Sequence, residues 1–162
     1  MYIVLEHTRN FSARLIQFWM FVDAVWHKKI IKKTYNHSFI CEGIIIWEAI
    51  DKGVFKTTFD RHYTHSKYNK SFNSKHIKLT LSPLEKIKMI NYLREQEGKE
   101  YEYSNFAFHP LKTIFNKWIG RKDDNKLYCY ELVIRALNAS GKYNLDPYMN
   151  PREFFEWVVT IK

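Results

Sequence analysis

The sequence contains few of the residues that mark several common chemistries. Only five glycines occur among 162 residues and none are clustered, which excludes a glycine-rich phosphate-binding loop. The two cysteines, Cys41 and Cys129, are too few for a disulfide framework, and neither belongs to a Cys-x-x-Cys pair. No apolar run is long enough to cross a bilayer, and the run after Met1 is too short for a signal peptide. As written, the chain is expected to be cytoplasmic, and export by another route would leave no mark on it.

Aromatic residues and positive charge are what the chain has in excess. Hydrophobic residues make up 46% and aromatic residues 17%, which is enough to fill a core, and the length predicts a single domain, residues 1–162. The net charge of +9 favours contact with nucleic acid, an acidic membrane surface or an anionic cell-wall polymer. The densest basic cluster, Lys28, Lys29, Lys32 and Lys33, has a spacing that suits one face of a helix. A solvated helix face is the simpler interpretation of this cluster.

Helical and β-prone patterns occur together without strand–helix–strand alternation, which predicts the α+β class with an antiparallel sheet packed against helices. Three β-prone runs, 35–41, 44–50 and 54–59, are joined by short connectors that contain Gly43 and Gly53, so we expect an antiparallel meander. Two more strands are expected at 2–5 and 76–81, a surface loop at 61–75, and helices that begin near residues 12, 83, 111, 129 and 151.

One of these helices carries a cysteine in its first turn. In the segment Leu127–Leu137, Cys129 follows a polar loop and precedes an apolar helical stripe. The unpaired amide groups and the positive dipole end of a helix start favour the thiolate, the nucleophilic form of cysteine. A small core residue is the more common role of a lone cysteine in such a helix. Cys41, at the end of its β-prone run, has no helix dipole and is interpreted as a packing residue.

A base and a carboxylate for this thiol are available upstream. A two-residue loop at positions 42 and 43 pairs residues whose numbers add to 85, so His37 and Glu48 are predicted to lie directly opposite each other on one face. Cys129, His37 and Glu48 then form a candidate triad, with the Cys129 amide as an oxyanion donor, although six other histidines compete for the role of base. The His62-x-x-His65 pair has no further ligand nearby, so no metal or other cofactor is expected.

Five short motifs resemble, in their order along the chain, the circularly permuted members of the NlpC-type, papain-like amidase superfamily, especially the YiiX-like group. In those proteins a helix precedes a strand that opens with the catalytic histidine. A second strand carries a polar partner in an apolar-Glu-Ala setting, and the nucleophile comes late in a Tyr/Phe-Cys-Ser-Glu-Leu-Val-like motif. The matching segments here, which span about residues 13–157, are Ala13–Trp19, Asn36–Ile40, Ile46–Ala49, Gly98–Tyr103 and Tyr128–Val133.

The resemblance implies a permuted papain-like core and a cysteine hydrolase that cleaves a peptide or peptidoglycan-stem amide through a thioester acyl-enzyme. Tyr128 and Tyr130 are then expected to border the cleft, and Tyr130, which replaces the family's small serine, would narrow it. Lipid-handling relatives imply an alternative, an acyl hydrolase or transferase at anionic membranes. A third interpretation is a non-catalytic nucleic-acid-binding module with an inert thiol, because Tyr and Lys are interleaved between residues 63 and 75. The sequence does not determine the natural substrate or the oligomeric state.

Overall fold

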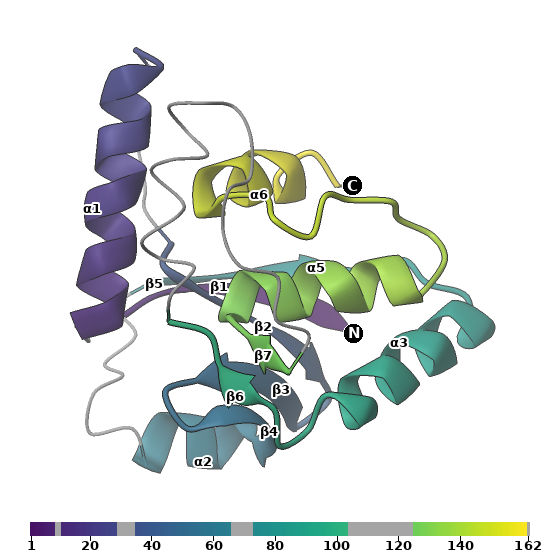
Figure 1. Ribbon diagram of the computed structural model, residues 1–162. Helices are drawn as coiled ribbons and strands as arrows, with labels where there is room; N and C mark the ends of the chain where they lie inside the picture. Colours follow the sequence, from purple (N-terminus) through teal and green to yellow (C-terminus); the bar gives the residue numbers. More distant parts are fainter. Residues whose placement is uncertain (9–10, 29–34, 66–72, 104–124, 162) are drawn as a thin grey trace.

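The computed structural model describes residues 1–8, 11–28, 35–65, 73–103 and 125–161. Its centre is a five-stranded antiparallel sheet in the order β4-β3-β2-β1-β5, and helices lie against both faces of this sheet (Figure 1). The α+β class and the antiparallel sheet are therefore confirmed. The five strands are β1 (Tyr2–His7), β2 (His37–Glu42), β3 (Ile45–Ile50), β4 (Gly53–Thr58) and β5 (Asn73–Lys78).

The expected meander β2-β3-β4 is present, but its first turn is one residue later than predicted. Gly43 has a φ of 58°, in the left-handed region that favours glycine, and it shares the turn with the exposed Ile44. Cys41 consequently pairs with Ile46, so that paired positions add to 87 and not to 85. A shift of two in this sum keeps every side chain on its predicted face but moves each partner along the strand by two residues.

Two helices, α3 (Pro83–Glu95) and α5 (Cys129–Ala139), pack together and cover one face of the sheet (Figure 1). The start of α3 is as predicted: Ser82 accepts from the Glu85 amide, and the Glu85 carboxylate accepts from the Ser82 amide. The main core lies between these helices and the sheet, where buried side chains such as Ile40 and Trp47 face α5.

The opposite face is covered by α2 (Phe59–His65), which corrects the surface loop expected at 61–75. The polar composition of that stretch concealed a short helix that has Asp60 in its first turn and packs Phe59 on the sheet. Residues 66–72 of the expected loop lie outside the described residues, and β5 begins at Asn73. The small core beneath α2 consists of Val4, Phe39, Cys41 and Ile46, so Cys41 is a packing residue as predicted.

The remaining helices, α1 (Phe11–Trp26) and α6 (Pro151–Val158), lie beside each other (Figure 1). A buried ion pair between Asp23 of α1 and Arg152 of α6 joins them. Among the described helices, none has the length and apolar character needed to span a membrane. Lys28 is exposed just after α1, whereas Lys29, Lys32, Lys33 and the helix expected near residue 111 lie outside the described residues.

Candidate active site

Cys129 is the first residue of α5, as the sequence predicts. The preceding residue, Tyr128, is extended and provides no side-chain capping hydrogen bond to the first amide groups of the helix. These amides have no partner within the helix because the chain has only begun to coil. The Cys129 side chain is almost fully buried, with 1% of its surface exposed. The sulfur therefore lies at the positive end of a helix, in a site from which most water is excluded.

His37 is the first residue of β2, and the backbone before it is fixed from two directions. On the β1 side, the Asn36 amide donates to the Glu6 carbonyl (2.9 Å), and the Asn36 side chain exchanges two hydrogen bonds of 2.8 Å with the Thr8 backbone. On the α5 side, the Tyr130 hydroxyl donates to the Tyr35 carbonyl at 2.6 Å. This segment is therefore tied both to the neighbouring strand and to the helix that carries Cys129.

The three predicted triad residues meet in space. The imidazole Nε2 of His37 lies 3.1 Å from Oε2 of Glu48, and the side chain of Cys129 interacts with the same ring and raises its pKa. The paired register continued along β3 places Phe39 opposite Glu48, so His37 reaches the carboxylate diagonally and not directly across as predicted. Both residues share a face because the register error was an even number of residues. The hydrogen-bonded contact is therefore present although the pairing behind its prediction was wrong.

His62, which sequence reasoning did not connect with the triad, joins it to a second carboxylate. Its Nδ1 lies 2.9 Å from Oε1 of Glu48, and its Nε2 lies 3.1 Å from Oε2 of Glu6. Tyr63 donates its hydroxyl to the other oxygen of Glu6. We refer to the resulting run of contacts as the buried polar chain, which consists of Cys129, His37, Glu48, His62, Glu6 and Tyr63.

Positive and negative charges alternate along the buried polar chain. Burial lowers the pKa of His37, but hydrogen bonds and charges from Cys129 and Glu48 outweigh burial and raise the pKa to about 10. Burial likewise lowers the pKa of His62, and the carboxylates of Glu48 and Glu6 raise it to about 9. Burial raises the pKa of Glu48, whereas the two imidazoles lower it to about 2. At neutral pH each imidazolium is therefore flanked by ionised carboxylate.

The sequence contains one signal that could have revealed part of the buried polar chain. Glu6 directly follows an apolar run in the sequence, and a carboxylate that is buried with such a run requires a partner. In the sheet Glu6 pairs directly with His37, and its side chain is fully buried. Nothing local marks His62, because it belongs to the stretch interpreted as a loop. Both of its ring nitrogens face carboxylates, and the described residues contain no group of three or more His, Cys, Asp or Glu side chains suited to a metal ion.

Tyr101 is a further polar group at the thiol. It belongs to β6 (Glu100–Tyr101), which pairs in parallel with β7 (Lys126–Leu127) immediately before α5. The preceding Lys99 carbonyl accepts from the Val54 amide at 2.8 Å, so the start of β4 holds this segment in place. Burial and the adjacent Cys129 raise the pKa of Tyr101 well above its ordinary value. Its hydroxyl therefore remains a neutral hydrogen-bond donor.

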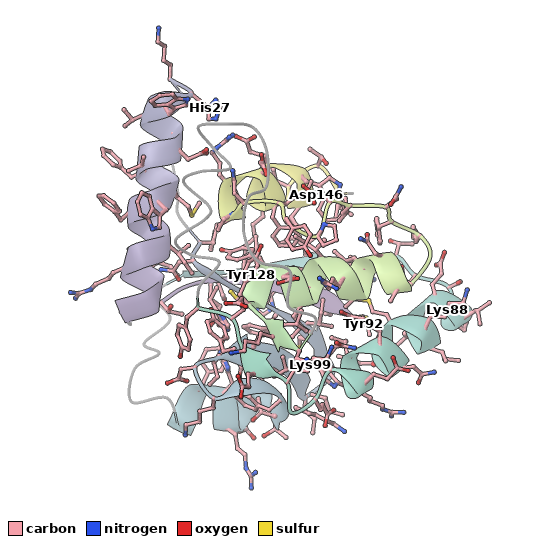
Figure 2. All side chains as sticks on the ribbon, viewed as in Figure 1. His27, Lys88, Tyr92, Lys99, Tyr128 and Asp146 are labelled. Carbon is pink, nitrogen blue, oxygen red and sulfur yellow. The ribbon has the colours of Figure 1, made fainter. Side chains whose placement is uncertain are left out.

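Tyr128 and Tyr130 were expected to border a cleft, but both side chains lie in the core with no exposed surface (Figure 2 labels Tyr128). The Tyr128 hydroxyl donates to the Met149 carbonyl (3.3 Å), and Tyr130 packs edge-on against Phe154. The bulk of Tyr130 consequently fills the space between α5 and α6 and does not narrow a surface cleft. Its contact with Tyr35 gives it a structural connection to the histidine strand.

Comparisons with known proteins add no information on function to the geometry of this site. No protein-family model matches the chain, and no curated protein matches it either. The permuted papain-like core thus stays a prediction from the five motifs. The contacts of Cys129, His37 and Glu48 are the observations on which a function can be based.

Proposed function

We propose that this protein is a cysteine hydrolase that cleaves an amide bond through a covalent thioester intermediate. The observation that carries the proposal is the position of the His37 ring, which is hydrogen-bonded to the carboxylate of Glu48 and also interacts with the thiol of Cys129. A nucleophile, a base and a group that orients the base are the minimum for this chemistry. The resemblance to the permuted papain-like amidases, by order of motifs, supports the same reading.

Each side chain has a defined role in the proposed reaction. Because Nε2 of His37 faces Glu48, Nδ1 is the ring nitrogen left to exchange a proton with the thiol. The thiolate of Cys129 attacks the carbonyl carbon, and the imidazolium then donates its proton to the leaving nitrogen as the C–N bond breaks. Water next attacks the thioester while His37 accepts a proton from it, and cleavage of the C–S bond releases the acid and restores the thiol.

Two donors are positioned for the negative charge that develops on the carbonyl oxygen. One is the backbone amide of Cys129 at the start of α5, and the other is the hydroxyl of Tyr101, whose pKa is raised by the nearby Cys129. Because Cys129 is almost fully buried, a bound substrate must enter between Cys129 and Tyr101. The Tyr101 hydroxyl then donates its hydrogen bond to the substrate oxygen. A peptide or peptidoglycan-stem amide is the proposed substrate, and the net charge of +9 is suited to anionic wall polymers.

Alkylation of the two cysteines tests this proposal, because the chain provides its own reference thiol. Cys41 is buried in the small core under α2, and burial raises the pKa of its thiol. Iodoacetamide labelling between pH 5 and 9, quantified for each cysteine peptide by mass spectrometry, should show faster labelling of Cys129 that persists below pH 7. His37→Ala should abolish this excess, and Cys129→Ser should remove the fast site. Equal, slow labelling of both cysteines would contradict the proposal.

A second candidate, a lipid acyl hydrolase or transferase at anionic membranes, is favoured by one surface. The exposed face of α1 presents four apolar side chains that are each more than half exposed, and Lys28 follows them. Aromatic side chains beside basic ones are typical of helices that bind the interface of anionic membranes. The apolar residues of this face are Phe18, Phe21, Val25 and Trp26.

Vesicle co-sedimentation tests this candidate. The protein should sediment with vesicles that contain phosphatidylglycerol and remain in solution with pure phosphatidylcholine, and Phe21→Glu should abolish the difference. Ile87→Glu on α3 is the matched control, since Ile87 is also about half exposed (55%) but lies on another helix. Equal loss in the two variants, or no sedimentation of the wild type, would exclude α1 as a membrane-binding face.

The nucleic-acid-binding interpretation receives no comparable support from the described residues. Tyr63, the first aromatic residue of the interleaved stretch, donates its hydroxyl to Glu6 and packs against Phe59 and His62. Residues 66–72 of the stretch lie outside the described residues. An inert Cys129 in the alkylation experiment would favour the nucleic-acid-binding interpretation over the hydrolase.

A further inference from the structure

The contacts of Glu48 extend beyond the triad. We infer that His62, held in place by Glu6, is a positioning residue that fixes the Glu48 carboxylate and sets the pH range in which Cys129 reacts. The inference deepens the proposed function and rests on it. It assigns a role to two buried side chains, an imidazole and a carboxylate, that the hydrolase mechanism itself does not use.

The Glu48 carboxylate is held at both of its oxygens. Each oxygen of Glu48 is bonded to a different imidazole, Oε2 to His37 and Oε1 to His62, so rotation of the carboxylate would break at least one contact. Glu48 is only 2% exposed, and water cannot readily replace a lost partner. His62 is in turn fixed by its second bond, to Glu6, which is fully buried. The orientation that the Glu48 carboxylate gives to His37 therefore depends on a group in α2.

The imidazole rings of His37 and His62 are also held at a fixed spacing. The His37 and His62 rings are nearly parallel, with an interplanar angle of 8° and centroids 6.4 Å apart. The Phe39 ring packs against both of them, at 5.8 Å from His37 and 4.8 Å from His62. The distance between the two imidazoles is thus held by an apolar side chain as well as by the shared carboxylate.

His62 also brings a positive charge close to the triad. The titratable groups facing His62 are Glu48 on β3, Glu6 on β1, His37 on β2 and Tyr63 beside it on α2. The positive charge of His62 offsets part of the negative potential that Glu48 and Glu6 create at His37. Removal of that positive charge makes proton loss from the thiol and from His37 less favourable, whereas removal of the Glu6 charge makes both more favourable.

The two variants should therefore move the pH profile of Cys129 in opposite directions. At a separation of 6.4 Å between the ring centroids, one charge shifts a titration by about two pH units at an effective dielectric of about 20. His62→Gln, which removes a positive charge, should shift the alkylation profile upward by about this amount. Glu6→Gln, which removes a negative charge and keeps the side-chain shape, should shift it downward.

The experiment measures the iodoacetamide rate at the Cys129 peptide between pH 5 and 10 for the wild type and both variants. Tyr63→Phe is the matched control, because it removes a hydrogen bond to Glu6 without changing the charge, and its profile should keep the wild-type midpoints. A purely structural role for His62 would lower the rate at every pH and would leave the midpoints in place. Circular dichroism verifies that each variant is folded, and if His62→Gln does not fold, the downward shift of Glu6→Gln is the deciding result.

The possible outcomes distinguish failure of the positioning role of His62 from failure of the proposed hydrolase function. Opposite shifts in His62→Gln and Glu6→Gln support the positioning role. Unchanged midpoints, or shifts in one direction, overturn it while a fast, His37-dependent reaction of the wild-type Cys129 leaves the hydrolase proposal standing. A wild-type Cys129 that reacts no faster than Cys41 overturns both.

Discussion

Removal of a single hydroxyl, by Tyr130→Phe, is expected to affect both the stability of the fold and the reactivity of Cys129. The Tyr130 side chain has no exposed surface, and its hydroxyl donates to the Tyr35 carbonyl at 2.6 Å. Tyr35 lies two residues before His37, and Tyr130 lies one residue after the nucleophile. This hydrogen bond thus connects the two backbone segments on which the contact between His37 and Cys129 depends.

The size of the effect follows from the burial of both partners. A buried hydrogen bond removed on one side leaves its acceptor unsatisfied, which costs about 1–3 kcal/mol of unfolding free energy. For a chain of 162 residues, each kcal/mol corresponds to a decrease in Tm of about 2–4 °C. The ring stays in place against Phe154, so no large cavity adds to this cost. A loosened approach of β2 to α5 should also slow the His37-dependent alkylation of Cys129, because that reaction depends on their mutual geometry.

Tyr128→Phe is the matched control for this prediction. Its hydroxyl also donates to a backbone carbonyl, that of Met149, but over 3.3 Å and in a segment remote in sequence from His37. Urea unfolding and Cys129 alkylation at pH 7 are to be measured for both variants. Tyr130→Phe should reduce stability and alkylation together, whereas Tyr128→Phe should reduce stability by about 1 kcal/mol or less and leave alkylation unchanged. Equal effects of the two variants on alkylation would refute the argument that Tyr130 positions the histidine strand.

Three further outcomes are expected. Gly53→Ala should lower the Tm more than Gly43→Ala, because a Cβ at Gly53 (φ 101°) would lie 2.4 Å from a backbone oxygen, whereas nothing lies within 4 Å at Gly43. Equal losses in the two variants would contradict this explanation. The His62 pKa of about 9 exceeds its ordinary value of 6.5, so its contribution to unfolding free energy is complete below pH 6.5 and is lost as the pH rises through 9. Urea unfolding at pH 6 and 9.5 should show this loss in the wild type and less of it in His62→Gln. Asp23→Ala should cost about 2 kcal/mol, because it removes the buried partner of Arg152 and leaves only the ion pair with the exposed Glu156, and a loss below about 1 kcal/mol would show that Glu156 and solvent compensate for Asp23.

The parts of the fold with local causes could be predicted from the sequence. Ser82 with Glu85, and Asn150 with Glu153, form the capping boxes that their spacing indicates, because a cap satisfies amide groups within four residues of itself. The cysteine helix also begins at its predicted position, Cys129. The presence of the meander was predictable as well, since glycine in a short connector allows the left-handed conformation with which the chain reverses.

The parts that depend on distant residues could not be predicted in the same way. The first hairpin turn contains Gly43 and Ile44, and no local rule excluded a turn one residue earlier. The role of His62 requires α2 to pack on the sheet, and that packing depends on the apolar face that β1, β2 and β3 build together. Tyr101 reaches the thiol only because β6 pairs with β7, which lies 26 residues later. Such contacts depend on how separated segments meet and leave no pattern within either one.

The location of the buried polar chain indicates why these charged side chains are buried. It crosses a face that is otherwise apolar, and buried ion pairs contribute little net stability compared with well-packed hydrocarbon of the same size. Stability alone therefore gives a weak reason for burying Glu6, His62 and Glu48 beneath α2. The buried polar chain leads, however, through His37, the first residue of β2, to Cys129 on a helix that covers the other face. Alternating charges that lead from one side of a sheet to a thiol on the other side are better explained by control of that thiol than by packing.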